Sequence, residues 1–115
     1  MSKTGLAETS EQETTPAPTM YREEEQDETV AKGHIRVTEV IVYDVVGKKK
    51  NEDGKEVDVE KGRRPYFYQD SEDYLTIREN NPKARLETFG IQMLKSIAVK
   101  YLNDPENMKQ FGRAV

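Results

Sequence analysis

The apolar positions of residues 81–103 recur at the spacing of an amphipathic helix, at steps of three and four. This stripe consists of Leu86, Phe89, Met93, Leu94, Ile97, Ala98, Tyr101 and Leu102. Asn81 is a favoured N-cap residue, and Pro82 fits the first helical position, where a missing N–H costs nothing. Pro105 disfavours helix in the residue before it. The pattern predicts one long helix from Asn81 to Asn103 whose apolar face covers a sheet.

Residues 35–46 are rich in β-branched side chains and predict a strand. Alternate positions from Ile35 to Val45 form one apolar face, which Glu39 interrupts. Val40 and Val42 lie on the other face, which is also apolar. The alternation therefore leaves open which face of this strand is buried.

Two shorter strands are predicted after a turn. Residues 47–54 contain Asp53-Gly54, the strongest local turn signal in the chain. Residues 55–60 alternate charged residues with valine, which is typical of a strand with one solvated side. Pro65 leads into the third strand, at residues 66–69. The brief connections favour an antiparallel meander.

Two further segments carry helix-start signals. Ser71 is a cap residue followed by the carboxylates of Glu72 and Asp73, but residues 71–79 fit either a short helix or a fourth strand. Asp104-Pro105 begins a short final helix that Gly112 ends.

These elements predict an α+β domain: a three-stranded antiparallel β-meander packed on one long C-terminal α-helix, with a short final helix. A core of this size is marginal for a domain that folds alone, so we expect the spare apolar strand face to be covered by a partner or a second copy. The predicted core consists of Val37, Val40, Val42, Val57, Val59, Phe67, Leu86, Phe89, Met93, Leu94, Ile97 and Tyr101.

Charge is distributed unevenly along the 115 residues. Residues 1–30 carry a net charge of −6 and almost no large apolar side chains, whereas residues 31–115 carry +2. This composition predicts a disordered acidic arm over residues 1–32, dispensable for folding, and a single domain over residues 33–115. The sequence contains no cysteine, no signal-peptide pattern and no apolar run of membrane-spanning length. We expect a cytoplasmic protein without a membrane partner.

The residue types that support catalysis or metal binding are sparse. His34 is the only histidine, and the glycines are spaced as turns rather than as a phosphate-binding loop. Asp70, Glu72 and Asp73 are better explained as a helix start than as a cation site. We therefore expect no enzymatic activity and no cofactor.

A second hypothesis comes from basic and aromatic residues. Tyr66 and Tyr68 share one strand face, and if the helix buries Phe67 they point outward, where arginines beside them resemble a base-stacking platform. Tyrosines packed in the core are the simpler alternative. The candidate nucleic-acid-binding residues are Lys48, Lys49, Lys50, Arg63, Arg64, Tyr66, Tyr68, Arg78, Lys83 and Arg85.

The first functional hypothesis is a non-catalytic protein-interaction module, an accessory or regulatory protein of the small kind that viruses, phages and mobile elements carry. Its partner is a larger assembly or a second copy of the chain. The alternative is a nucleic-acid-binding domain whose acidic arm competes with the ligand for the basic surface.

Overall fold

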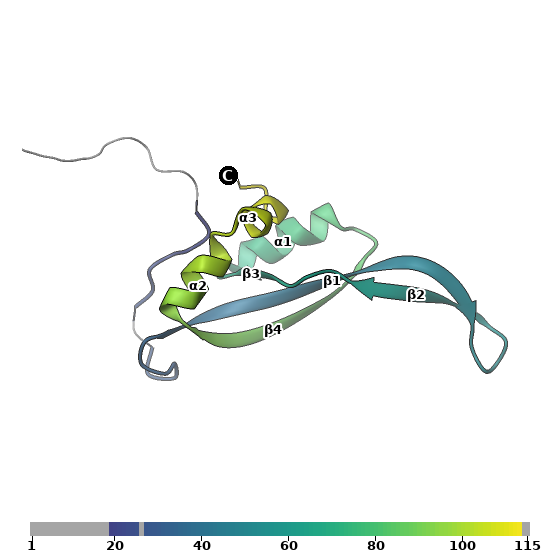
Figure 1. Cartoon of the computed structure of the whole chain (residues 1–115), viewed down its shortest axis with the longest axis horizontal. Helices are drawn as coiled ribbons and strands as arrows, with labels where there is room; N and C mark the ends of the chain where they lie inside the picture. The colour runs from purple at the N-terminus through teal and green to yellow at the C-terminus, as the bar shows by residue number, and fades with distance from the viewer. Residues whose placement is uncertain (1–18, 26, 114–115) are drawn as a thin grey trace, which may run out of the picture.

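The computed structural model describes residues 19–25 and 27–113 (Figure 1). Its elements in chain order are β1 (His34–Lys50), β2 (Glu56–Gly62), β3 (Tyr66–Tyr68), α1 (Ser71–Asn80), β4 (Arg85–Leu94), α2 (Lys95–Leu102) and α3 (Pro105–Gln110). The predicted α+β class with an antiparallel sheet is confirmed. No helix in the described ranges is long and apolar enough to cross a membrane.

Strand β1 pairs with each of the other three strands. One of its edges carries β2, opposite residues 43–50, and then β3, opposite Thr38 to Val40. Its other edge carries β4, opposite residues 34–43. The predicted meander is therefore wrong, because β3 pairs with β1 and not with β2.

The predicted helix over residues 81–103 is also wrong. Its first part is strand β4, and only Lys95–Leu102 is helical. Thr88 and Ile91 are β-branched, and a helical Gly90 would cost about 1 kcal/mol relative to alanine. All ten residues of β4 pair with β1, and these backbone hydrogen bonds stabilise the strand over the helix. The backbone N–H of Lys95 donates to the Gly33 carbonyl (3.0 Å) and completes this ladder.

Beyond the body of the sheet, β1 and β2 extend as a two-stranded ribbon (Figure 1). The register shifts between Val45 and Gly47, so the ribbon begins at a β-bulge. Gly54, with a φ of 76°, lies in the turn as expected. The lysines at 48–50 belong to β1 rather than to the turn. Val57 and Val59 are only partly buried, because no helix covers the ribbon.

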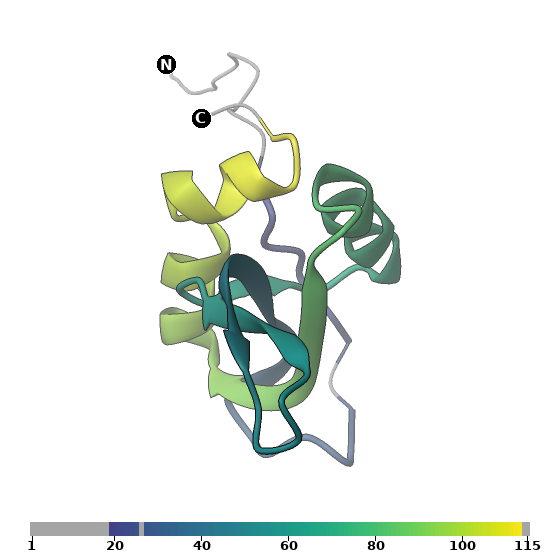
Figure 2. The same cartoon turned by 90° about the vertical axis from the view of Figure 1, so that its right-hand side faces the viewer.

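Both faces of β1 contribute to the core. Ile35 and Val37 are buried on one face, whereas Val40 and Val42 are buried on the other. Figure 2 shows α1 and α2 on opposite sides of the sheet. Residues 71–79, which the sequence assigned to either a helix or a strand, belong to helix α1. Its N-cap is Asp70 rather than Ser71.

The predicted core is confirmed in part. Val37, Val40, Val42 and Phe67 are buried, and Leu86 and Met93 are partly buried. Four others are exposed, at Phe89 (44%), Leu94 (48%), Ile97 (41%) and Tyr101 (46%). The prediction that these four side chains are buried depended on one continuous helix. The chain instead changes from strand to helix after Leu94, so the four do not share one helical face.

The outer edge of β3 is covered by one side chain of α3. The Asn107 amide accepts a hydrogen bond from the Phe67 N–H (2.6 Å) and donates to the Phe67 carbonyl (2.8 Å). Asn107 is fully buried and also donates to the Leu102 carbonyl (3.2 Å). The amide thus replaces the neighbouring strand that β3 lacks on this side.

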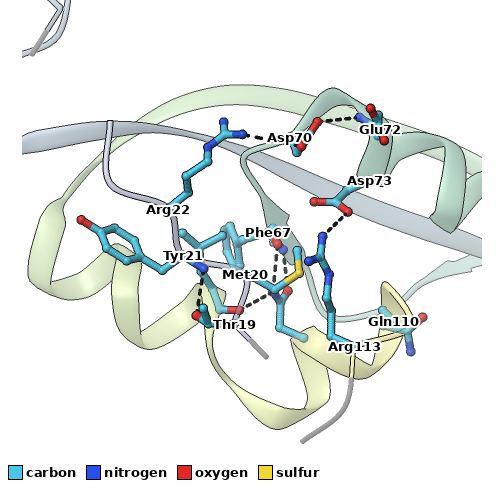
Figure 3. A network of polar contacts seen from close by, with 12 residues as sticks. Thr19, Met20, Tyr21, Arg22, Phe67, Asp70, Glu72, Asp73, Gln110 and Arg113 are labelled. Atoms are coloured by element: carbon cyan, nitrogen blue, oxygen red, sulfur yellow. Dashed lines mark hydrogen bonds and ion pairs between the residues drawn. The ribbon is translucent and has the colours of Figure 1, made fainter. Parts of the chain in front are cut away.

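The described part of the N-terminal segment lies on the domain. Met20 (5% exposed) and Val30 (7%) are buried, and Figure 3 shows Met20 pointing into the core. The backbone N–H groups of Met20 and Tyr21 both donate to Asn103 Oδ1, at 3.1 and 3.2 Å. Residues 1–18 of the predicted arm lie outside the described residues.

Asn107→Ala is expected to lower the free energy of unfolding by about 2–4 kcal/mol, because it leaves the buried N–H and carbonyl of Phe67 unpaired. The matched control is Asn80→Ala, since Asn80 also donates to an α3 carbonyl, that of Gln110 (3.0 Å), but is exposed. The control is expected to cost no more than about 0.5 kcal/mol. Urea denaturation measures both, and equal costs would contradict the role of Asn107.

Deleting residues 1–30 is expected to lower the melting temperature relative to deleting residues 1–18, because only the longer deletion removes Met20. Met20→Ala alone is expected to cost about 2–5 kcal/mol, and each kcal/mol shifts the melting temperature by about 4–8 °C. Glu25→Ala, an exposed change in the same segment, is the control. Equal melting temperatures for the two deletions would show that residues 19–30 add nothing to stability.

Candidate binding groove

A groove of about 890 Å³ separates α2 from the sheet. Its floor comes from three strands, its wall from α2, and one end from the segment before β3 together with the start of α3. The lining residues are Glu39, Arg64, Pro65, Phe67, Ile91, Met93, Ile97, Lys100, Tyr101 and Asp104.

The floor follows from the register of the sheet. Glu39 of β1 is opposite Phe67 of β3 on one side and opposite Phe89 of β4 on the other. Residues opposite each other in an antiparallel sheet project to the same face. Because side chains alternate along β4, Ile91 and Met93 project to that face too. The floor is therefore apolar except for Glu39.

Glu39 is the exception in this floor. Its side chain is partly buried, and in the described part of the chain no residue forms a hydrogen bond or an ion pair with it. A carboxylate on a partly buried apolar surface loses hydration without gaining a partner, which costs stability. The groove thus offers an acceptor for a donor from outside the chain.

The helical wall adds aromatic and aliphatic surface. The ring of Tyr101 packs against that of Phe67, with centroids 5.1 Å apart. Ile97 and Tyr101 still expose more than two fifths of their surface, as does Phe89. Exposed large apolar side chains gathered on one face mark a contact surface more often than scattered ones do.

Ion pairs lie at both ends of this face. Near the groove's α3 end, Arg64 binds Asp104 at 2.9 Å, and this hydrogen bond holds the pKa of Asp104 below its usual value. Beyond Phe89, the Arg85 guanidinium stacks over the Tyr43 ring (4.1 Å) and binds both Glu60 (2.9 Å) and Glu87 (2.8 Å). Polar contacts therefore border the apolar surface.

The outward position predicted for Tyr66 and Tyr68 is wrong. Both residues are only 5% exposed, and the neighbouring Phe67 is buried as well. Tyr68 packs against Phe111, and burial raises the pKa of its hydroxyl. A strand with helices on both of its sides has no outward face, so these tyrosines form no stacking platform.

Most of the predicted cationic residues are engaged within the chain. Lys48 binds Asp58 (2.5 Å), and Arg63 binds both carboxylate oxygens of Asp44, at 2.7 and 2.8 Å. Arg78 donates to the backbone carbonyls of Asn81 and Ala84. Arg64 and Arg85 have the carboxylate partners described above.

Three predicted cations are exposed and have no partner in the described ranges. They are Lys49, Lys50 and Lys83, of which the first two lie on the ribbon and the third in the loop before β4. In the ribbon, Lys50 is opposite Glu56, so negative charge accompanies the lysines. The candidate nucleic-acid residues therefore do not meet in one basic surface, although their binding role stays a prediction.

Sequence reasoning missed Glu39, Ile91 and Lys100 as candidate site residues. Glu39 left a signal, because it interrupts the apolar face of residues 35–45. Ile91 and Lys100 left none, since neither belongs to the apolar stripe that predicted a helix over residues 81–103.

The described residues contain no group of three His, Asp or Glu side chains arranged to hold a metal ion. Comparisons with protein-family models, with curated proteins and with solved structures found no match.

Glu39→Leu is expected to raise the free energy of unfolding by about 0.5–2 kcal/mol, because it removes an unpartnered carboxylate from an apolar surface. Glu87→Leu is the matched control on the same sheet face. Glu87 accepts from Arg85 (2.8 Å) and Tyr43 (2.9 Å), so its loss is expected to destabilise. Thermal unfolding measures both, and a destabilised Glu39→Leu chain would mean that this carboxylate serves the fold.

Proposed function

We propose that this chain is a non-catalytic protein-interaction module, an accessory or regulatory protein that binds an extended segment of a larger partner in the groove between α2 and the sheet. The observation that carries the proposal is the position of Glu39. It lies between Phe67 and Phe89 without a partner in the described part of the chain. Residues kept at a cost to stability are found mostly at functional sites.

The groove's chemistry defines the partner. Apolar side chains of an extended segment fit between the wall residues Ile97 and Tyr101 and the floor residues Ile91 and Met93. A lysine or arginine in that segment pairs with Glu39 and satisfies its carboxylate. Lys100, exposed on the wall, accommodates a carboxylate of the partner.

Nucleic-acid binding has weaker support. The tyrosines that would stack on bases are buried, and Arg63, Arg64 and Arg85 already pair with carboxylates. A titration of the chain with labelled single-stranded and duplex oligonucleotides at low salt tests this alternative. Tight, steeply salt-dependent binding that groove changes leave intact would favour it over the groove proposal.

Selection from a displayed random-peptide library on the whole chain is expected to enrich peptides that alternate apolar residues with one lysine or arginine. Ile97→Glu is expected to weaken the selected peptides at least tenfold, about 1.4 kcal/mol, because it places a charge in the apolar wall. Glu39→Gln is expected to weaken the peptides that carry a cation more than those in which that cation is replaced by alanine.

Leu75→Glu is the control for this experiment. Leu75 is an apolar residue of α1, 61% exposed, on the opposite side of the sheet. Its substitution is expected to leave peptide affinity unchanged. Peptides that bind equally well to the Ile97→Glu chain, or a library that yields no enriched sequence, would contradict the proposal.

A further inference from the structure

The ribbon formed by β1 and β2 carries different side chains on its two faces. Tyr43 and Val45 of β1 lie on the groove face of the sheet, because side chains alternate along the strand from Glu39 onward. Their partners in β2 are Gly62 and Glu60, so the even-numbered residues of β2 share that face. A Cβ at Gly62 would lie 3.0 Å from the Tyr43 ring, as this requires. The odd-numbered residues of β2 therefore project to the face on the α1 side.

All three acidic residues of β2 lie on the groove face. Two of them have basic partners there, since Asp58 binds Lys48 (2.5 Å) and Glu60 binds Arg85 (2.9 Å). The third, at position 56, is opposite Lys50 in the ladder. The charge on this face is therefore largely compensated within the chain.

The face on the α1 side leaves its lysines uncompensated. This face, the ribbon patch, consists of Gly47, Lys49, Val57, Val59 and Lys61. Lys61 is opposite Asp44, but both oxygens of that carboxylate accept from Arg63, at 2.7 and 2.8 Å. Lys49 is opposite Val57, which offers no charge. In the described part of the chain neither lysine has a hydrogen-bond or ion-pair partner.

Gly47 leaves a gap in the middle of the ribbon patch. It is opposite Val59, and a Cβ at Gly47 meets no atom within 4 Å. Val59 thus has no side chain beside it across the ladder, and no helix of the described chain covers the ribbon (Figure 1). Lys49, level with Val57, lies one step of about 6.6 Å to one side of the gap, and Lys61 lies one such step to the other. The two lysines are therefore about 13 Å apart along the ribbon.

We propose that the ribbon patch binds an acidic segment of a partner protein, in which two carboxylates flank an aliphatic residue. In an extended segment, side chains four residues apart lie on one side and about 13 Å apart, which matches the spacing of Lys49 and Lys61. The side chain midway between them occupies the gap at Gly47 and contacts Val59. Each carboxylate accepts a charge-assisted hydrogen bond from one of the two lysines.

A protein segment fits this patch better than a nucleic acid or an anionic membrane does. Val57 and Val59 lie between the cations, and aliphatic side chains do not contribute contacts to phosphate oxygens. The turn at the tip of the ribbon carries Glu52 and Asp53, and the opposite face carries further carboxylates, so a polyanion is repelled as it approaches. Two lysines also provide little of the counterion release on which binding to a polyanion depends.

The ribbon patch is independent of the groove. It lies on the α1 side of the sheet, and none of its residues lines the groove. The two surfaces also prefer segments of opposite charge, because Glu39 accepts from a cation whereas Lys49 and Lys61 donate to carboxylates. Either surface can therefore bind its segment when the other does not.

A synthetic peptide with the core Glu-Thr-Val-Thr-Glu, titrated into the isotope-labelled whole chain, tests the proposal by NMR. Adding it up to about 1 mM is expected to shift the amide signals of the ribbon patch and to leave those of Ile91 and Ile97 in the groove unchanged. A peptide with the core Lys-Thr-Val-Thr-Lys is expected to leave the patch signals unchanged, because like charges repel. A patch that does not respond to the acidic peptide, or that responds equally to both, would overturn the proposal.

Gly47→Val fills the gap without removing a charge. Gly47 has no positive φ and its Cβ has room, and valine favours strands, so the variant is expected to fold at least as stably as the wild type. It is expected to weaken the acidic peptide by about tenfold or more, because the aliphatic side chain of the peptide loses its position. Lys49→Ser and Lys61→Ser are each expected to weaken the peptide about two- to fivefold and to reduce the salt dependence of binding.

Lys50→Ser is the matched control, because Lys50 is also an exposed lysine of the ribbon but lies on the groove face, opposite Glu56. It is expected to bind the acidic peptide like the wild type. Thermal unfolding checks that each variant is folded. A folded Gly47→Val chain that binds the peptide normally would overturn the proposal, as would a Lys50→Ser chain that loses it to the same extent as Lys49→Ser.

Further titrations separate the other occupants. A single-stranded oligonucleotide and vesicles of phosphatidylcholine with phosphatidylserine are each expected to leave the patch signals unchanged. A stronger response to either than to the acidic peptide would overturn the proposal in favour of a nucleic acid or a membrane surface. Patch signals that shift as the chain alone is concentrated would overturn it in favour of a second copy.

Discussion

Every strand in the part of the chain that the structure describes is hydrogen-bonded to β1, so the ladder partners of that one strand determine the arrangement of the sheet. Its edges carry β2 and β3 on one side and β4 on the other. A strand that is central over most of its length must bury side chains on both faces. The two apolar faces of residues 35–46 meet this requirement, with Val37 buried on one face and Val40 on the other.

The short strand β3 depends on a second constraint. Three residues provide little ladder pairing, and the outer edge of β3 would be open without the amide of Asn107. That contact holds α3 against the edge of the sheet. Asn103, in the connection between α2 and α3, accepts hydrogen bonds from the backbone N–H groups of Met20 and Tyr21. Two asparagines thus connect the end of the chain, the sheet edge and the N-terminal segment.

The candidate groove results from the position of α2, which begins where β4 ends. Because the helix follows directly after β4, it covers the sheet near Met93 and leaves the surface around Phe89 open. Glu39 lies in the floor between these two regions, in a position where a carboxylate has no partner in the described chain.

The sequence by itself determined the α+β class, the first strand, the turn at Asp53-Gly54 and the final helix at Pro105, because each rests on a local signal of capping, turn chemistry or β-branching. It also marked Glu39 as an interruption in an apolar face. Only the tertiary structure decided residues 81–103, since the spacing of Leu86, Phe89 and Met93 fits a helix while Phe89, Ile91 and Met93 fit a strand. Pairing with β1 is a non-local interaction that no window along the chain contains. The burial of Tyr66 and Tyr68 was decided in the same way, because a side chain's exposure depends on which distant helices cover its strand.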